Sequence, residues 1–272
     1  MLPMTLTPQT RASSPKAAEF ALAAFVLLAS LAAAWLPPVM LPEGYHAFAD
    51  QRGWFGLPHA MDVLTNLPFA IVGAFMLRAA WRARGRLSVT ERSLACLTSV
   101  GLLATSLCSS IYHLWPDAGG LALDRLGMVV VFTGVLGLAA ASRVSDRAGW
   151  LLACGVGALA PLAAMWDLLT MNMTPWVVLQ GGGLLLLLAL SLCPVRAGAA
   201  HIALWPILGL YALAKMLELA DAPVLALTQG LISGHSAKHL VAAAALWPMA
   251  MAFWRMVPRG QACESRKIDA QN

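Results

Sequence analysis

The sequence predicts an all-α integral membrane protein with about eight membrane-crossing helices. Of its 272 residues, 60% are hydrophobic and 11% are charged, whereas an ordinary soluble domain carries about 25% charged residues. The mean hydropathy is +0.72. At about 20 apolar residues per span, the chain has room for roughly eight spans joined by short loops. This composition excludes a soluble globular fold and places any function in or at a bilayer.

Eight apolar runs, bounded by Pro, Gly and charged residues, are the predicted spans. In chain order they cover about 18–36, 59–81, 93–115, 119–142, 149–166, 175–193, 199–219 and 228–254. Tryptophans, which prefer the headgroup region, mark the ends of the first three runs, both ends of the fifth, the start of the sixth and the end of the eighth: Trp35, Trp81, Trp115, Trp150, Trp166, Trp176 and Trp254. Charged residues lie at the ends of the other two runs. Asp117 and Arg143 flank the fourth run, and Arg196 and Asp221 flank the seventh.

Basic residues occupy alternate loops and both tails, which by the positive-inside rule predicts that both termini are cytoplasmic. They are Arg11, Lys16, Arg82, Arg84, Arg86, Arg92, Arg143, Arg147, Arg196, Arg255, Arg259, Arg266 and Lys267. The loops on the other side carry Asp50, Asp117, Asp167 and Asp221. Because the net charge of +5 is spread over these loops and tails, it indicates topology, and nucleic acid is excluded as a partner. Residues 1–36 also fit a signal peptide, whose removal would leave seven spans in the same orientation.

Ionisable side chains within spans are candidate functional residues, because each costs about 2.5–3.5 kcal/mol at the centre of a bilayer. His235 and His239 are four residues apart in the last span, so both rings project from one helix face, as two ligands of one metal require. Taken alone, the pair equally fits two hydrogen-bonded core histidines. His113 lies at the end of the third span, on the same non-cytoplasmic side. Three histidines with one open position are typical of a catalytic zinc (Zn²⁺) site.

Two further residues fit the chemistry of a zinc-activated water. Asp124 lies about one turn inside the fourth span, across a short loop from His113, where a general base is needed. The alternative is an ion pair with Arg125. Ser109 lies four residues before His113 on the same helix face, where its hydroxyl would orient the water or donate to a developing oxyanion. Its alternative is a hydrogen bond to a carbonyl of its own helix.

Six other polar residues are expected to have structural roles. His46, His59 and His201 fall near loops, outside the candidate site. Lys215 and Glu218, three apart in the seventh span, are expected to form an ion pair, with a role in binding a polar headgroup left open. Lys238 is expected to face away from the two histidines and to extend toward the interface. The run Gly181–Gly183 indicates a helix-packing surface.

Taken together, Ser109, His113, Asp124, His235 and His239 resemble the alkaline ceramidases, which share a superfamily with the progestin and adipoQ receptors. The stretches Tyr45–Arg52 and Asp62–Phe69 are similar to the bacterial branch of that family. The resemblance covers about residues 45–255. It implies a seven-transmembrane hydrolase domain over 45–255, preceded at 1–44 by a tail, an additional first span and the start of an outer loop, and followed at 256–272 by a polar cytoplasmic tail.

The resemblance further implies zinc held by His113, His235 and His239, a zinc-bound water managed by Asp124 and Ser109, and hydrolysis of the amide of ceramide or a similar N-acyl lipid. The implied setting is a bacterial cytoplasmic membrane, with the metal toward its outer side. Eukaryotic relatives also bind Ca²⁺ near the start of their first core helix. Here Asp50, Asp62 and Asn66 are the nearby oxygen ligands, fewer than the six to eight oxygens that Ca²⁺ prefers, so helix capping and interhelical hydrogen bonding are the favoured roles.

Two other functions remain open at this point. One is a receptor-like or lipid-binding protein whose zinc site performs no significant hydrolysis, although little of the chain lies outside the membrane. The other is a haem or ion-conducting protein that uses His235 and His239. Haem usually takes facing axial ligands rather than three converging histidines beside a carboxylate. The leading prediction is therefore a zinc-dependent membrane amidase that acts on a bilayer lipid.

Overall fold

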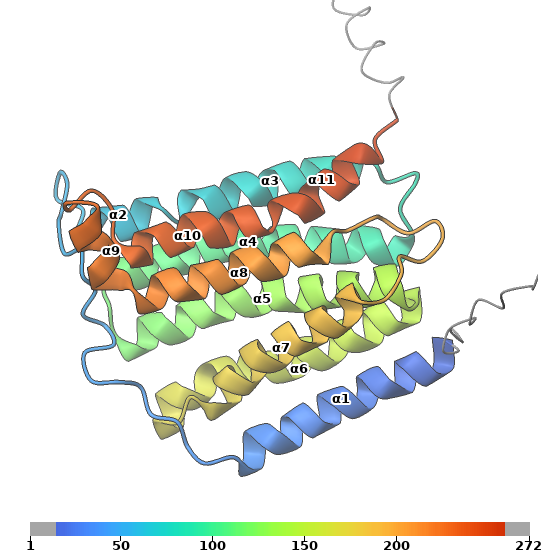
Figure 1. The fold of residues 1–272 in the computed structure, drawn as a ribbon, viewed down its shortest axis with the longest axis horizontal. Helices are drawn as coiled ribbons and strands as arrows, with labels where there is room; N and C mark the ends of the chain where they lie inside the picture. The colour runs from blue at the N-terminus through green and yellow to red at the C-terminus, as the bar shows by residue number, and fades with distance from the viewer. Residues whose placement is uncertain (1–14, 259–272) are drawn as a thin grey trace, which may run out of the picture.

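The protein is an elongated bundle of roughly parallel and antiparallel helices, as Figure 1 shows. The structure is a computed structural model and describes residues 15–258. Within that range it contains eleven helices and, apart from an isolated bridge between Trp54 and Leu57, no β-structure. The predicted all-α class is confirmed for the described residues. Arg11, Arg259, Arg266 and Lys267, on which part of the predicted orientation depends, lie outside them.

The helix bounds follow the predicted apolar runs closely. They are α1 Pro15–Trp35, α2 Ala60–Leu64, α3 Leu67–Arg82, α4 Val89–Leu114, α5 Ala118–Arg143, α6 Asp146–Thr170, α7 Thr174–Ser191, α8 Leu204–Leu219, α9 Asp221–Leu227, α10 Gly234–Ala245 and α11 Trp247–Arg255. The short helix α9 lies in what the sequence predicts to be a loop.

Within residues 15–258, six helical segments are long and apolar enough to cross a membrane: α1, α2 with α3, α4, α5, α6 and α7. A multi-pass membrane protein is therefore supported, while the predicted count of eight spans is not established. Helix α8 has only 16 residues, and the last predicted span is divided into α10 and α11, of 12 and 9 residues. Pro248 causes that division, because it has no N–H to continue the helical hydrogen bonds and sits in the first turn of α11.

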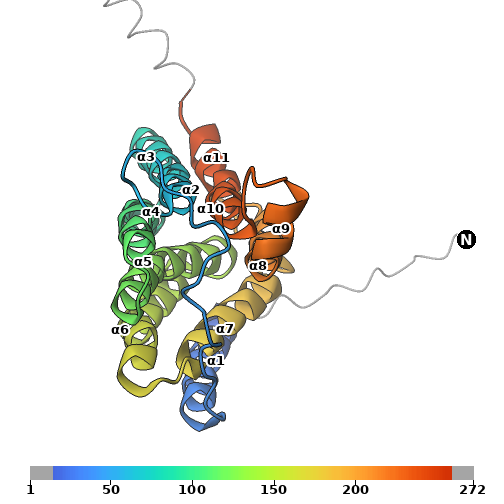
Figure 2. The same ribbon diagram turned by 90° about the vertical axis from the view of Figure 1, so that its left-hand side faces the viewer.

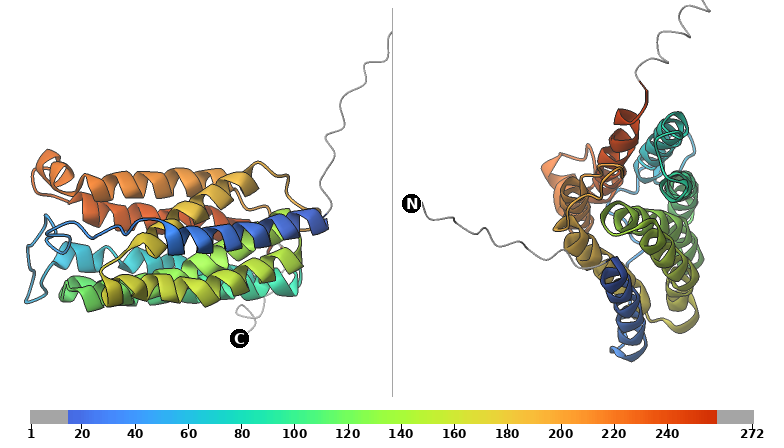
Figure 3. Two further views of the ribbon diagram at one scale, coloured as in Figure 1. Left: turned by 90° about the horizontal axis from the view of Figure 1, so that it is seen from below. Right: turned by 90° about the vertical axis from the view of Figure 1, so that its right-hand side faces the viewer.

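The two ends of the bundle differ. At one end, hereafter the site end, α4 finishes, α5 and α10 begin, and the short helices α2 and α9 lie (Figure 1). Helix α1 begins and α11 finishes at the opposite end. The end-on views of Figures 2 and 3 place α1 at the edge of the bundle, beside α6 and α7. Only Leu22 of α1 is buried, so this helix adds little to the core.

Glycines allow α4 and α5 to pack with their backbones in contact. A Cβ atom added at Gly134 of α5 would lie 2.2 Å from Oγ1 and 2.8 Å from the backbone nitrogen of Thr98 on α4. One added at Gly101 of α4 would lie 2.6 Å from the backbone nitrogen of Val131. Without a hydrophobic driving force between helices in lipid, such close packing is a main source of association. This pair of helices thus holds Ser109 and Asp124 in fixed relation.

Candidate metal centre

The three predicted histidines converge at the site end. His113 comes from the last turn of α4, and His235 and His239 come from the first two turns of α10. One ligand nitrogen from each lies within 4.8 Å of the others, and all three side chains are buried. Among the described residues this is the one group of three or more His, Cys, Asp or Glu side chains arranged to hold a metal ion.

Caps and a close approach fix the start of α10. The Ser233 side chain accepts a hydrogen bond from the backbone nitrogen of Ser236 at 3.0 Å, which begins the helix. The backbone nitrogen of His235 donates to Oδ1 of Asp221 at 2.8 Å. A Cβ atom at position 234 would lie 2.2 Å from the carbonyl oxygen of Leu217, so only Gly234 lets α10 pass α8 this closely. Both histidines of α10 are therefore held by their backbone.

The spacing of two of the histidines is compatible with a tetrahedral metal such as zinc. The Nε2 atoms of His113 and His235 are 3.3 Å apart, and two nitrogens bound tetrahedrally to Zn²⁺ at about 2.0–2.1 Å would lie roughly 3.3–3.4 Å apart. Thr65 Oγ1 donates to the carbonyl of Met61 at 2.7 Å, so at 3.1 Å it accepts a hydrogen bond from Nδ1–H of His239. That bond leaves Nε2 of His239 free to bind a metal, as in many zinc sites. Without metal, the 3.3 Å contact also permits a hydrogen bond between the two histidines.

Asp124 and Ser109 lie on neighbouring helices beside one of the histidines. The Ser109 hydroxyl lies near enough to the Asp124 carboxylate to interact with it. Both side chains line one cavity together with His239. Arg125 instead pairs with Asp167, with 3.1 Å between Arg125 Nη1 and Asp167 Oδ2. The sequence-based alternative of an Asp124–Arg125 ion pair is therefore wrong.

Other buried hydroxyls donate a hydrogen bond to a carbonyl of their own helix, which is the alternative role considered for Ser109. Thr98, Ser99 and Thr133 each donate to the carbonyl four residues earlier, at 2.8 Å. Ser109 contrasts with them, because its side chain meets a carboxylate from the neighbouring helix. The position of Ser109 is thus compatible with a chemical role.

The cavity beside these residues is amphipathic, with a volume of about 140 Å³. Its polar part lies toward the site end and includes Ser109, Asp124, His239 and Lys238. Its apolar part runs between α4, α5, α7, α8 and α10 to Val135, Leu187, Ile207 and Leu246. From Asp124 to Val135 this is about 16 Å along α5, at 1.5 Å per residue. The cavity is thus shaped for a ligand with a polar group and a long apolar chain.

The loop 36–59 covers the histidines at the site end. The Phe48 ring centroid lies 4.6 Å from that of His113 and 4.4 Å from that of His235. The backbone nitrogen of Ala49 donates to Asp221 Oδ2 at 2.9 Å. His46 Nδ1 lies 2.8 Å from the Tyr112 hydroxyl, outside the triad as expected. The loop therefore separates the triad from the space beyond the site end.

The residues considered for Ca²⁺ have protein partners instead. Asp50 accepts hydrogen bonds from Arg52 Nε at 2.8 Å and Nη2 at 2.6 Å, and the Arg52 guanidinium holds the pKa of Asp50 below its usual value. Asp62 Oδ1 accepts from Ser236 Oγ at 2.5 Å, and Asn66 Nδ2 donates to the Asp62 carbonyl at 2.8 Å. Asn66 makes no side-chain cap, however, and Asp62 Oδ2 and Asn66 Oδ1 are buried without a hydrogen-bond partner, so the structural roles expected for these residues are only partly present.

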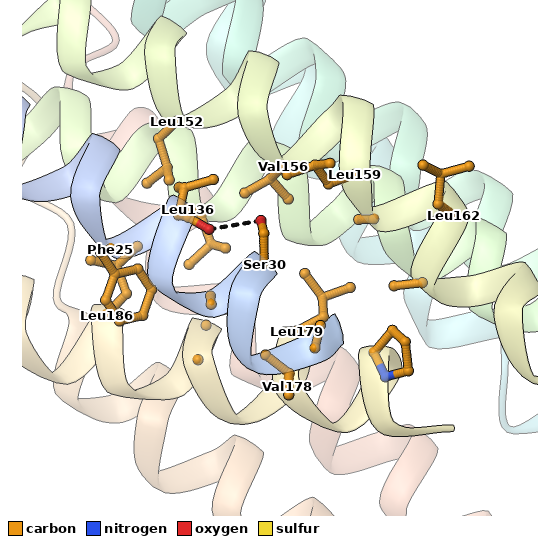
Figure 4. Close-up of a pocket in the computed structure, with 18 of the residues that line it drawn as sticks. Phe25, Ser30, Leu136, Leu152, Val156, Leu159, Leu162, Val178, Leu179 and Leu186 are labelled. Carbon is orange, nitrogen blue, oxygen red and sulfur yellow. Dashed lines mark hydrogen bonds between the residues drawn. The ribbon is translucent and has the colours of Figure 1, made fainter. Parts of the chain in front are cut away.

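A larger cavity, of about 280 Å³, lies between α1, α6 and α7 (Figure 4). Its walls are almost entirely apolar, with Phe25, Leu152 and Leu179 among them. The Ser30 hydroxyl is already bonded to the carbonyl of Val26 at 2.8 Å. The cavity lacks the polar groups that catalysis needs, so its size does not make it the candidate site.

Two residues of the site escaped the sequence analysis. Lys238 does not extend toward the interface: its side chain is 19% exposed, lines the cavity, and places Nζ 2.6 Å from Glu218 Oε1. The expectation for Lys238 is therefore wrong, because Glu218 on α8 provides a partner inside the bundle. Thr65 was not singled out, and its local sequence carries no sign that it meets His239. The expected Lys215–Glu218 ion pair is present.

No protein-family model matches this chain, and no curated protein matches it. The functional assignment therefore depends on the geometry of the site itself.

Proposed function

We propose that the protein is a zinc-dependent membrane amidase that hydrolyses the N-acyl amide bond of ceramide or a similar long-chain N-acyl lipid. The products are a fatty acid and a long-chain amine. One observation carries this proposal: the group of three histidines adjoins, through His239, a largely apolar cavity that Asp124 and Ser109 also line. Three protein ligands with a fourth position open are the pattern of a catalytic rather than a structural zinc.

The proposed fold has eight spans, with seven helices over 45–255 and α1 added in front. In support, α8, and α10 followed by α11, run along the bundle beside the longer helices (Figure 1). The proposed location is a bacterial cytoplasmic membrane, with both termini cytoplasmic. The site end, where acidic residues replace basic ones, then faces outward.

The chain's own groups divide the reaction between them. Zinc would supply Lewis-acid polarisation of the amide carbonyl and activation of a water molecule. The Asp124 carboxylate accepts a proton from the attacking water and returns it to the amide nitrogen as the C–N bond breaks. The Ser109 hydroxyl donates to the carbonyl oxygen as negative charge develops there. One water is consumed, with OH added to the acyl carbon and H to the amine.

The cavity determines how the substrate lies. Its apolar part, lined by Val135, Leu187 and Ile207, would hold the acyl chain. The carbonyl then meets Asp124 and the histidines, and the amine portion points to the site end. Because Phe48 and its loop cover the triad there, we expect lipid to enter sideways from the bilayer.

The test is turnover of N-acyl lipids by detergent-purified protein. The panel shares one acyl chain and varies the amine, with released fatty acid as the readout and metal content measured on the same sample. We expect about one zinc per chain, release of fatty acid, loss of activity on chelation and recovery with zinc. Stoichiometric zinc without release from any member of the panel would overturn the amidase and favour the receptor-like, lipid-binding alternative.

A further inference from the structure

Two lysines share one carboxylate at the polar end of the cavity. Lys238 of α10 places Nζ 2.6 Å from Glu218 Oε1, and Lys215 of α8 pairs with Glu218 Oε2. The three side chains come from two helices and all line the same cavity as Asp124 and His239. The cluster therefore adjoins the proposed reaction centre.

The position of the cluster matches the amine portion of a bound lipid. Lys238 is close enough to Asp124 to interact with it electrostatically, and Tyr45 of the covering loop interacts with Lys238 and Glu218. In the proposed function, the acyl chain extends the opposite way along the cavity, toward Val135 and Ile207. A group beside the amide nitrogen would thus lie next to the two ammonium groups.

The hydrogen-bonding capacity of the cluster favours an anion. Each ammonium has three N–H donors, and each makes one ion pair among the described residues, to the same carboxylate. Both oxygens of Glu218 are already used. Asp124 is occupied by Ser109 and by the proposed proton transfer. A cationic headgroup would find no free carboxylate here, whereas an anionic one would find spare N–H groups.

We propose that Lys238 and Lys215 form a subsite for an anionic group on the amine portion of the lipid, a carboxylate or a phosphate. The inference deepens the proposed function and rests on it for the direction in which the lipid lies. The substrate class is then a long-chain N-acyl lipid whose amine portion carries an anionic group, and an N-acyl amino acid serves as a simple probe of that group. Glu218 positions the two lysines.

The experiment compares two ligands of nearly equal shape and different charge, N-palmitoylglycine and N-palmitoylethanolamine. Binding to the full-length protein in lipid nanodiscs is measured by displacement of a fluorescent fatty-acyl probe. A charge-assisted hydrogen bond contributes about 1.5–3 kcal/mol, so the wild type should bind the carboxylate at least about tenfold more tightly. Lys238→Met should reduce this preference several-fold, because only the Lys215 ammonium remains to pair with the anion, and it should leave the affinity for the ethanolamide within about twofold. Equal binding of both ligands by the wild type would overturn the subsite.

Further variants separate charge from folding. Lys238→Met leaves Glu218 paired with Lys215, and Lys238→Arg should keep the preference. Glu218→Gln should widen it by freeing both ammonium groups. Arg78→Met removes a basic residue of α3 outside the cavity and should change nothing. An undiminished preference in Lys238→Met would show that other groups, such as a bound metal, select the anion, and it would overturn the subsite.

Two readouts keep the conclusions distinct. Inorganic phosphate or N-acetylglycine should not displace the probe; displacement by either would assign the lysines to a free anion and overturn the lipid subsite. Fatty-acid release is followed in the same samples. If the protein prefers the carboxylate ligand through Lys238 but releases no fatty acid, the subsite is supported and the amidase proposal fails. If it releases fatty acid but shows no preference for the carboxylate ligand, the amidase proposal is supported and the subsite fails.

Discussion

Helix α5 is chemically different at its two ends. Near the site end it carries Asp124 and Arg125, which face a carboxylate, a hydroxyl or an aromatic ring of another helix. Toward the opposite end it carries Gly134 and the fully buried run 138–141, which pack against neighbouring helices with little space. The site end of the bundle also carries the histidines and the lysine pair. In α5, therefore, the chemistry lies in one half and the closest packing against α4 lies in the other.

This separation predicts which property each substitution changes. Changes in the closely packed half should affect folding, because a methyl group has no room there. Changes at the site end should affect metal binding or turnover while the bundle persists, because the α4–α5 contact that holds it lies elsewhere. Three predictions test the contrast.

The largest effect on the fold is expected from Gly134→Ala. The new Cβ would overlap Thr98, including its backbone, and overpacking typically costs about 1–3 kcal/mol. We expect a marked drop in the thermal unfolding midpoint and in the yield of folded protein. Gly181→Ala is the control, because a Cβ there has nothing within 4 Å, and the loss of a helical glycine should be neutral or stabilising by about 0.5–1 kcal/mol. Equal midpoints for the two variants would refute the close-packing argument.

Asp124→Asn should keep the fold and most of the zinc but lose about 10²–10⁴-fold in amide hydrolysis, because the amide cannot accept the proton. Ser109→Ala should lose less, with about 10²–10³-fold as an upper guide for one oxyanion donor. Initial rates at matched zinc content provide the measurement. Wild-type activity in Asp124→Asn would make the carboxylate a structural partner and return weight to the receptor-like alternative.

The smallest effect concerns the orientation of a metal ligand. Thr65→Val removes the acceptor for Nδ1 of His239 and should weaken zinc binding about 10–100-fold. His235→Ala provides the reference, since losing one of three ligands should leave little zinc bound. Competition against a chelator of known affinity measures both. Unchanged zinc affinity in Thr65→Val would show that Thr65 does not support the metal site. Full zinc content in His113→Ala, His235→Ala and His239→Ala would show that these residues are not the ligands.

Much of this arrangement could be predicted from local patterns. Long apolar runs with terminal tryptophans define the helices, and a spacing of four residues aligns His235 with His239. The alternation of the spans is enough to bring His113 to the same end. These features depend on helix geometry and on chain direction, both of which are properties of short stretches of sequence.

Features that depend on a particular neighbour could not be predicted. The close approaches occur at Gly101 and Gly134, whereas a Cβ at Gly181, in the run expected to be a packing surface, would meet nothing within 4 Å. The partner of Lys238 lies 20 residues away on another helix, and that of Thr65 lies 174 residues away. Such contacts follow from how the helices are rotated and offset against one another, which apolar periodicity leaves undetermined.

Asp221 joins two parts of the protein that would otherwise be independent. One oxygen of its carboxylate holds the covering loop at Ala49, and the other holds the backbone of His235 in α10. Phe48 packs on the rings of both His113 and His235. Lifting the loop would break these contacts together, so the loop and the first turn of α10 form one cooperative unit of local unfolding. The lifetime of a bound metal is then governed by the opening rate of that unit, and amide hydrogens at Ala49 and His235 should exchange with solvent at a common rate.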